Sequence, residues 1–379
     1  MHSVLLRRST GMLALVATSA MVVSACSAPT KSSDTTTAPG GKSAATATSA
    51  ADLGGMDALV TAAKKEGALN VIALPPDWAN YGAIIKAFGD KYGIKVTSAQ
   101  PDASSADEIT AADRLKGQST APDVFDLGAA VALANTARYA PYKVATFADV
   151  PDSFKDANGA WVNDYGGYMS IGYDSSKVPA ITSVADLLKP EFKGKVALNG
   201  DPTKAGAAFA GVQMVSVAQG GTAGDLTKGV DFFKQLKAAG NFIPVDPTPA
   251  TIQSGQTPVV IDWDYLNAAA TAKLPSWKVV VPEGAVIAGY YYQAINKDAP
   301  HPAAARLWQE FLYSDEGQNL WLKGGARPVR FDAMQKAGSL DAAAAAALPK
   351  VSGTPVVPSQ ADATSGKAYL ATAWANAVG

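Results

Sequence analysis

The chain has 379 residues, of which 48% are hydrophobic and 17% are charged, so it is long enough to form two domains of ordinary size. Its 32 Lys and Arg residues balance 33 Asp and Glu residues, and the resulting net charge of −1 offers no basic field for a nucleic acid. One Cys and two His residues exclude a disulfide framework, a Cys/His zinc site and most histidine-based catalysis.

The N-terminus has the pattern of a secretion signal. Arg7 and Arg8 precede an apolar run over residues 12–23, which is shorter than the roughly 20 residues that a spanning helix needs. The run ends in Val-Ser-Ala-Cys at residues 23–26, which resembles a bacterial lipobox. We therefore expect residues 1–25 to be removed and Cys26 to carry lipid on the outer face of the bacterial cytoplasmic membrane. The alternative is an ordinary signal peptide in which Cys26 is incidental.

A segment of low complexity follows the lipobox. Residues 27–50 consist almost entirely of Ser, Thr, Ala, Gly, Pro and Lys, and they contain no large apolar side chain. Such a segment cannot bury a core of its own. We expect residues 26–50 to be the lipidated cysteine and a flexible tether.

Helices and strands alternate in the first half of the body. Apolar spacing predicts helices over 53–65, 78–92 and 105–115, and strands over 69–74, 94–97 and 122–127. Residues 105–108 have the spacing of a capping box, with Ser105 as the first residue. Alternation with short connections predicts a parallel sheet that is covered on both faces.

A similar alternation begins again later in the chain. Predicted strands cover 195–198 and 258–262, and predicted helices cover 205–218, 230–239 and about 266–273. Two extended segments, 165–173 and 285–295, fall between the halves. Three further helices are expected at 302–313, 315–322 and the alanine-rich 341–348.

Five stretches carry a family resemblance. They are residues 65–67 (Lys-Glu-Gly), 88–96, 186–196 (with Leu-Leu-Lys-Pro-Glu-Phe-Lys-Gly-Lys-Val at 187–196), 296–302 and 314–318. In this order they are similar to ABC-transporter substrate-binding proteins, in the group that includes iron(III), polyamine and aminoethylphosphonate binders. The resemblance covers about residues 66–351.

The resemblance implies an α/β fold of the type II periplasmic-binding-protein kind, with two α/β lobes joined by two crossover strands. We expect residues 51–165 plus 290–379 to form the first lobe and 166–289 the second, with the two extended segments as crossovers. It also implies a monomer that closes on a small-molecule ligand and delivers it to an ABC permease with a cytoplasmic ATPase.

Candidate ligand-binding residues follow from a general rule of open α/β sheets, in which ligands bind beyond the carboxyl ends of strands. The rule selects polar and aromatic residues after strands in both halves, and the second crossover adds three consecutive Tyr residues. The candidates are Asp77, Trp78, Tyr81, Ser104, Ser105, Asp126, Thr203, Lys204, Asp262, Trp263, Asp264, Tyr290, Tyr291 and Tyr292.

Several candidates have structural alternatives. Asp77, Ser105 and Asp264 are suited to capping helices, and Lys204 to a solvated surface. Trp78 and Tyr81 are equally suited to a core. Strand alternation would place Tyr291 on one face of the second crossover and its two Tyr neighbours on the other.

The ligand class has three alternatives. Trp78 and Tyr81 are similar to the aromatic loop of polyamine binders, where rings bracket an alkylammonium chain and carboxylates hold its ends. Lys204 departs from that pattern, because it stands near where those proteins carry an acid; with Ser104 it would suit a zwitterion such as an aminophosphonate. The third alternative is iron(III) held by Tyr291 and Tyr292.

The sequence contains no nucleotide-binding glycine loop, metalloprotease helix or esterase elbow. His301 lies in Pro-His-Pro at the start of a predicted helix, which favours a capping or loop role. We therefore expect a transport receptor without enzyme activity and without a cofactor. A hydrolase and a structural surface lipoprotein are the alternatives from other classes.

Overall fold

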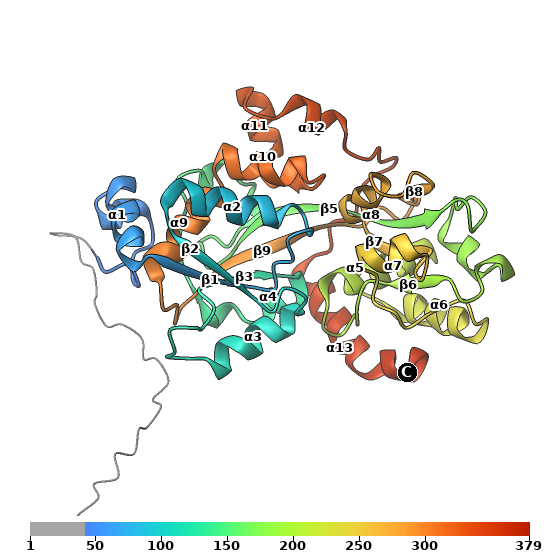
Figure 1. Cartoon of the computed structure of the whole chain (residues 1–379). Helices are drawn as coiled ribbons and strands as arrows, with labels where there is room; N and C mark the ends of the chain where they lie inside the picture. Colours follow the sequence, from blue (N-terminus) through green and yellow to red (C-terminus); the bar gives the residue numbers. More distant parts are fainter. Residues whose placement is uncertain (1–41) are drawn as a thin grey trace, which may run out of the picture.

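A computed structural model describes residues 42–379 of the chain (Figure 1). The expected signal peptide, Cys26 and the first part of the expected tether lie outside the described residues. Among residues 42–379, every helix falls short of the length or the apolar character that crossing a membrane requires.

The described residues form ten strands, most of them in one mixed sheet. They are β1 (Ala68–Ile72), β2 (Lys95–Ala99), β3 (Val124–Leu127), β4 (Tyr139–Ala140), β5 (Val162–Asp174), β6 (Val196–Leu198), β7 (Val259–Trp263), β8 (Trp277–Val280), β9 (Ala288–Asn296) and β10 (Arg327–Pro328). Eight of them share a sheet whose central order is β3-β9-β5-β7-β6, with β4 on β9 and with β8 and β10 on β5. The remaining two, β1 and β2, pair in parallel.

The expected parallel sheet is correct only inside each half of the molecule. The pairs β1–β2 and β6–β7 are parallel, whereas β5 and β9 run antiparallel to each other and to their neighbours β7 and β3. The reason is topological. The chain leaves the first half along β5 and returns along β9, so the two crossovers must run in opposite directions.

Thirteen helices cover the strands of the described part. They are α1 (Met56–Glu66), α2 (Tyr81–Tyr92), α3 (Ser105–Arg114), α4 (Ala129–Ala134), α5 (Gly206–Ala218), α6 (Thr227–Ala238), α7 (Pro249–Ser254), α8 (Asp264–Thr271), α9 (Pro302–Leu312), α10 (Asp315–Lys323), α11 (Phe331–Ala337), α12 (Ala342–Ala346) and α13 (Gln360–Val378). Figure 1 shows α1–α4 and α9–α12 at one end, α5–α8 at the other, and β5 and β9 running between them. These ends are the first and second lobes, and the expected two-lobed fold is confirmed.

The first lobe has its core where α2 meets α9. The Phe88 ring lies 5.1 Å from the Trp308 ring and 5.6 Å from the Phe311 ring, and all three side chains are buried. Such edge-on aromatic contacts add to the hydrophobic burial. They fix α2, whose N-terminal residue Tyr81 faces the junction of the lobes.

Helix α3 begins at the expected residue, but its capping box begins one residue earlier than expected. Ser104, and not Ser105, is the N-cap: the Asp107 carboxylate accepts a hydrogen bond from the Ser104 N–H at 3.0 Å, which completes a capping box. Asp107, and not the expected Glu108, supplies the carboxylate of the capping box. Glu108 instead points into the protein, where its carboxylate accepts the Asp126 N–H at 3.1 Å. Ser105 instead accepts the N–H of Gly128 at the start of α4.

The folded body includes residues that the sequence assigns to the tether. Ala44 and Ala47 are buried, and the Arg306 guanidinium donates to the carbonyl groups of Ala45 at 3.1 Å and Ala47 at 2.8 Å. Arg306 on α9 is itself buried, so its donors require acceptors. The small side chains of this segment let its backbone come close enough to supply them.

The C-terminal helix α13 packs against α6 of the second lobe and also contacts α4 of the first, whereas the sequence places residues 290–379 in the first lobe. The Trp374 ring lies 5.1 Å from the Phe233 ring of α6, and Gly366 approaches Phe209 of α5. Val356 precedes the helix and bonds the backbone beside β9, donating to Val286 at 2.7 Å. Packing against apolar side chains of α5 and α6 therefore places α13 at the second lobe. Residues 347–359, between α12 and α13, form a third connection between the lobes.

We expect Trp374→Ala to lower the free energy of unfolding by about 3–5 kcal/mol, because it removes a buried aromatic side chain. The measurement is the midpoint of urea unfolding of the full chain. Asn376→Ala, an exposed change on the same helix, is the control and should shift the midpoint little. Equal midpoints for the two variants would show that α13 does not stabilise the second lobe.

Candidate ligand-binding site

Aromatic side chains from both lobes and both crossovers meet where the lobes join. This interlobe cluster consists of Trp78, Tyr81, Tyr165, Trp263, Tyr265, Tyr291 and Trp321. The Tyr165 and Tyr291 rings, from β5 and β9, are parallel with centroids 5.5 Å apart. Trp78 meets Tyr291 edge-on at 5.8 Å and Tyr265 at 6.4 Å, so it joins the first lobe to a crossover and to the second lobe.

A strained turn after β1 places Trp78 in the cluster. Ala79 and Asn80 have φ angles of 45° and 68°, a left-handed conformation that non-glycine residues rarely adopt. The Asn80 amide donates to the Leu320 carbonyl at 2.7 Å and thereby stabilises the turn. The Trp78 indole N–H then donates to the Tyr165 hydroxyl at 2.7 Å.

Two buried carboxyl groups lie at the first-lobe side of the cluster. Asp126 Oδ2 accepts the hydroxyl groups of Tyr81 at 2.9 Å and Tyr165 at 3.1 Å, while its Oδ1 is buried without a donor in the described part of the chain. Asp164 Oδ1 accepts the Tyr165 N–H at 2.7 Å, and its Oδ2 likewise has no donor there. The two carboxyl groups lie within hydrogen-bonding reach of each other. Two ionised carboxylates have no proton to share, so this contact becomes a hydrogen bond only when one of them is protonated.

Burial dominates the electrostatics of this pair. Desolvation raises the pKa of Asp126 to about 7. Desolvation also raises the pKa of Asp164, and the neighbouring Asp126 charge adds to it. Glu108 behind them is buried and has a raised pKa for the same reason. None of the described side chains that act on Asp126 or Asp164 is cationic.

The second lobe contributes two further buried acids with different partners. Asp262 accepts the Asn199 amide and the Trp263 N–H, both at 2.8 Å, and burial raises its pKa to about 7. Asp264 instead forms an ion pair with Arg327 at 3.0 Å and accepts two backbone N–H groups. Asp264 is therefore charge-compensated, whereas Asp262 is not.

Arg327 connects three parts of the molecule. It lies on β10 of the first lobe, pairs with Asp264 of the second and donates to the Pro349 carbonyl of the third connection at 3.0 Å. Its guanidinium also stacks over the Tyr168 ring at 4.6 Å. Arg327 therefore holds the two lobes together in the closed arrangement.

The structure brings together six of the fourteen residues that the sequence selects. These six are Trp78, Tyr81, Asp126, Asp262, Trp263 and Tyr291. The other eight have partners or positions outside the cluster: Asp77, Ser104, Ser105, Thr203, Lys204, Asp264, Tyr290 and Tyr292. Asp77 is exposed on the turn that carries Trp78, and Thr203 bonds Asp201 at 2.8 Å.

The three consecutive Tyr residues of β9 alternate as expected. Tyr291 alone joins the cluster, while Tyr290 packs on Phe154 and Tyr292 on Trp161, each with ring centroids 4.8 Å apart. Tyr291 and Tyr292, the expected iron pair, therefore lie on opposite faces of β9, as neighbouring side chains of a strand do.

The lobes are closed against each other beside the cluster. A Cβ atom on Gly206 of α5 would lie 2.9 Å from the Gly128 Cα that precedes α4, so the two backbones are in contact. Lys204 stands at the rim with a side chain 64% exposed and its Nζ 3.7 Å from Asp201. It is therefore not the buried cation that the zwitterion hypothesis needs.

Four parts of the site were not selected from the sequence. Tyr165 and Asp164 lie near the start of a crossover, whereas the strand-end rule examines only the residues that follow strands. Gln293, which donates to the Tyr81 hydroxyl at 3.1 Å, lies two residues after Tyr291 and so on the same face, a signal that was present in the sequence. Trp321 of α10, whose ring lies 5.1 Å from the Tyr165 ring, follows no strand and was not selected either.

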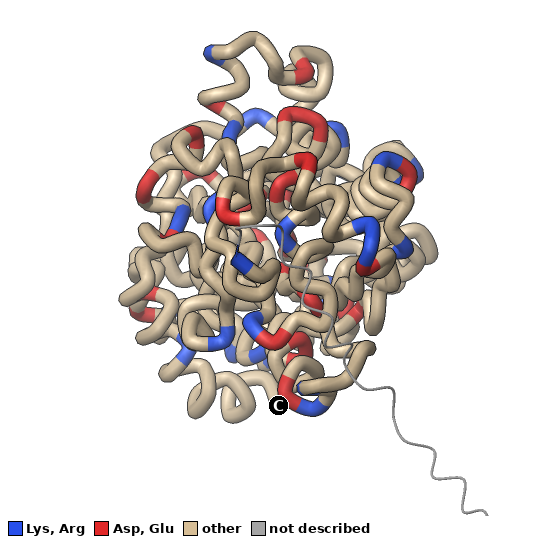
Figure 2. The backbone as a smooth tube through the Cα atoms, turned by 90° about the vertical axis from the view of Figure 1, so that its left-hand side faces the viewer, with Lys and Arg blue, Asp and Glu red and all other residues tan. Residues whose placement is uncertain are grey.

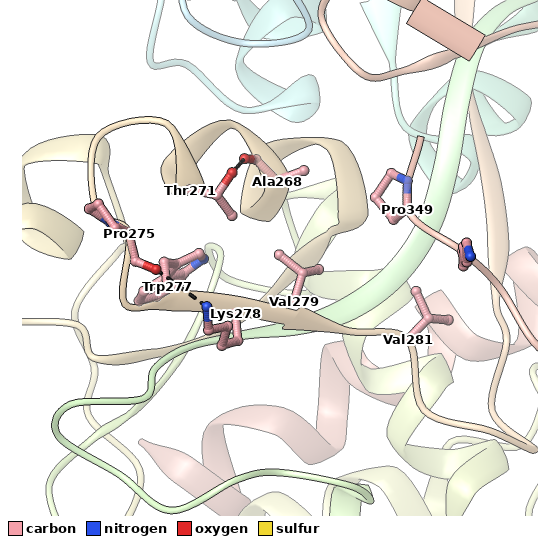
Figure 3. Close-up of a pocket in the computed structure, with 9 residues that line it drawn as sticks. Ala268, Thr271, Pro275, Trp277, Lys278, Val279, Val281 and Pro349 are labelled. Atoms are coloured by element: carbon pink, nitrogen blue, oxygen red, sulfur yellow. Dashed lines mark hydrogen bonds between the residues drawn. The ribbon is translucent and has the colours of Figure 1, made fainter. Parts of the chain in front are cut away.

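A cavity of about 490 Å³ lies elsewhere in the molecule, between α8, β8 and the third connection. Figure 3 shows Val279 of β8 and Val281, which follows the strand, facing Thr271 and Pro349 across it. No acid lines this cavity.

Acidic and basic residues are interspersed along the chain (Figure 2). The interlobe cluster, with its uncompensated buried acids, is therefore the better candidate for a polar solute.

Residues 119–353 match the family described as bacterial extracellular solute-binding protein. No curated protein matches the chain. Similar solved structures include AgtB from A. tumefaciens R10 with agropinic acid (18% identity, 82% of this chain and 98% of that chain, TM-score 0.65). Others are AfuA from Actinobacillus pleuropneumoniae with fructose-6-phosphate (17%, 83% and 99%, 0.63) and iron-bound HitA from Pseudomonas aeruginosa (20%, 80% and 97%, 0.57). These likenesses confirm the periplasmic-binding-protein fold.

We expect Arg327→Met to lower the free energy of unfolding by about 3–5 kcal/mol at pH 8, because it leaves Asp264 buried without its cation. Burial already raises the pKa of Asp264, so a lower pH protonates it and the loss at pH 5 should be smaller. The measurement is urea unfolding at both pH values.

The double variant Arg327→Met/Asp264→Asn should recover much of the loss at pH 8, since no charge is then left buried. Lys350→Met, an exposed change beside Pro349, is the control. A loss that is equal at both pH values and is not recovered by the double variant would contradict the role of the pair.

Proposed function

We propose, on the premise that the chain belongs to the bacterial extracellular solute-binding protein family, that it is the receptor of an ABC importer for a solute that carries an ammonium group. The solute would be captured between the lobes, and the closed form would be presented to a permease with a cytoplasmic ATPase. Lipid on Cys26 would keep the receptor at the membrane. No reaction is performed on the solute.

The observation that carries this proposal is the buried pair Asp126 and Asp164. An ionised carboxylate in such surroundings requires a cation, and the described part of the chain supplies none. An ammonium group has three donors, enough to bond the two unpartnered oxygens, Asp126 Oδ1 and Asp164 Oδ2. The faces of the surrounding rings would add cation–π attraction.

A second acid favours a solute with more than one amine. Asp262 approaches the cluster from the second lobe, also without a cation, and the rings of Trp263, Tyr265 and Tyr291 lie between it and the first-lobe pair. An alkyl chain along these rings would bring an amine to each end. A solute that contacts acids of both lobes stabilises the closed form, because only that form makes both contacts.

The two other ligand classes are less well supported. An aminophosphonate needs a cation for its phosphonate, but Lys204 is exposed and Arg327 is held by Asp264. Iron(III) would need hard oxygen ligands on one face, and Tyr291 and Tyr292 point to opposite faces. A polyamine is therefore our first choice within the amine class.

We expect spermidine or putrescine to bind the mature protein in titration calorimetry, and Trp78→Ala and Asp126→Asn each to weaken binding by about ten- to a hundredfold through loss of a ring or a charge. Asp90→Asn, an exposed acid on α2, is the matched control and should bind normally. The competing probes are 2-aminoethylphosphonate and ferric citrate. Tight binding of either one, with no binding of the amines, would overturn the proposal.

We expect Gly206→Val to hold the lobes apart, because even a Cβ atom would lie 2.9 Å from the Gly128 Cα. In small-angle scattering the wild type should become more compact when spermidine is added, and this variant should not. Gly89→Ala in α2 is the control, since its Cβ would meet only the Ile94 carbonyl at 3.4 Å. Normal compaction of Gly206→Val would show that closure does not need this contact.

A further inference from the structure

We propose that binding of an amine to the interlobe cluster releases one proton, which Asp126 and Asp164 share before the solute arrives. The inference rests on the proposed function and adds the proton as a second ligand of the same site. It makes solute affinity depend on the acidity of the space outside the membrane.

The geometry of the pair requires something between the two carboxyl groups. Asp126 Oδ1 and Asp164 Oδ2 are both buried without a donor within residues 42–379, and the side chains are 7% and 0% exposed. The groups are close enough to hydrogen-bond, yet carboxylates are only acceptors. A proton on one of them supplies the donor that both oxygens lack.

The surroundings of the pair favour that proton on every side. The titratable groups that face it are Glu108 from α3, Tyr81 from α2, Tyr165 from β5, Tyr291 from β9, Tyr313 after α9 and Tyr265 from the second lobe, and the neutral Gln293 amide acts on Asp164 as a hydrogen-bond donor. Each of these groups is neutral or acidic. A bound proton is therefore stabilised by the local field, and nothing in the described surroundings repels it.

Titration supports the same conclusion. Burial raises the pKa of Asp126 to about 7, and the pKa of Asp164 is raised as well. Two interacting carboxyl groups lose their protons in separate steps, so the pair as a whole keeps one proton over the intervening pH range. A solute-free receptor near neutral pH is thus singly protonated at this point.

The exchange balances in atoms and charge. The protonated pair carries one negative charge, and an O–H bond of one carboxyl breaks as the ammonium enters. The proton passes to the solvent, and the two carboxylates with the ammonium again carry one negative charge. The solute thereby avoids the cost of burying a second uncompensated charge, which is what makes ionisation of the pair accessible.

The sign of the pH dependence follows from linkage. Where the free pair holds the proton and the complex does not, each unit of rising pH strengthens binding by about tenfold. The gain should continue above about pH 7, because ionisation of Asp126 leaves the remaining proton on Asp164, whose pKa is raised by burial and by the Asp126 charge. The amine stays charged throughout, since alkylammonium groups titrate near pH 10.

The test is calorimetry of spermidine binding to the mature protein near pH 7.5, where the pair holds one proton, in phosphate and in Tris, whose ionisation enthalpies differ. We expect about one proton to be released by the wild type and by Asp90→Asn. Asp164→Asn should release almost none, because its amide can donate to Asp126 and no proton is shared. If Asp164→Asn does not fold, Asp126→Asn replaces it.

Infrared spectra give a readout that needs no solute. The wild type near pH 7.5 should show more protonated-carboxyl absorbance than Asp164→Asn, because Glu108 and Asp262 contribute equally to both spectra, and spermidine should remove this difference. Binding without proton release or without loss of this difference would overturn the exchange and leave the proposed function intact. Absence of any amine binding would overturn both.

Discussion

Asp126 and Asp164 are buried side by side without a cation in the described part of the chain, and this constraint distinguishes the junction of the lobes from the rest of the molecule. Two other buried acids have a basic partner: Asp264 has Arg327 at 3.0 Å, and Asp123 has His301 at 2.9 Å. Glu108 and Asp262 have none in the described part of the chain, but each stands alone, accepting hydrogen bonds from neighbouring groups. Asp126 and Asp164 differ from them because they are neighbours, so ionising both would bury two negative charges together.

The fold places that constraint where it can control closure. The pair lies on β3 and β5, Asp262 lies on β7, and the crossovers β5 and β9 run between the lobes. A cation held from both sides therefore pulls on the two lobes at once. The third connection, through Val356, and the contacts of Arg327 limit how the closed lobes can be placed relative to each other. A solute bound between the lobes would therefore stabilise one relative position of the lobes.

Local patterns predicted most of the elements and about half of the candidate cluster. Trp78, Asp126 and Trp263 follow from the strand-end rule, and the position of Tyr291 follows from alternation, because both depend on short-range geometry. The partnership of Asp264 with Arg327 spans 63 residues of sequence, so no local pattern contains it. The position of α13 was missed for a related reason: the alanine-rich helix has a weak amphipathic pattern, and its contacts with α6 and α4 are distant in sequence.

The same scaffold accommodates agropinic acid, a sugar phosphate and iron in the three similar structures, so the fold does not decide the solute. What decides it is the balance of charge at the junction. A neutral solute would leave the Asp126–Asp164 pair protonated and gain little from it, and an anion would add a second negative charge to a buried acidic site. Only a cation both replaces the proton and satisfies the two carboxylates. In the proposed function, selectivity for amines would therefore arise from the cost of desolvating charge, before the shape of the solute is considered.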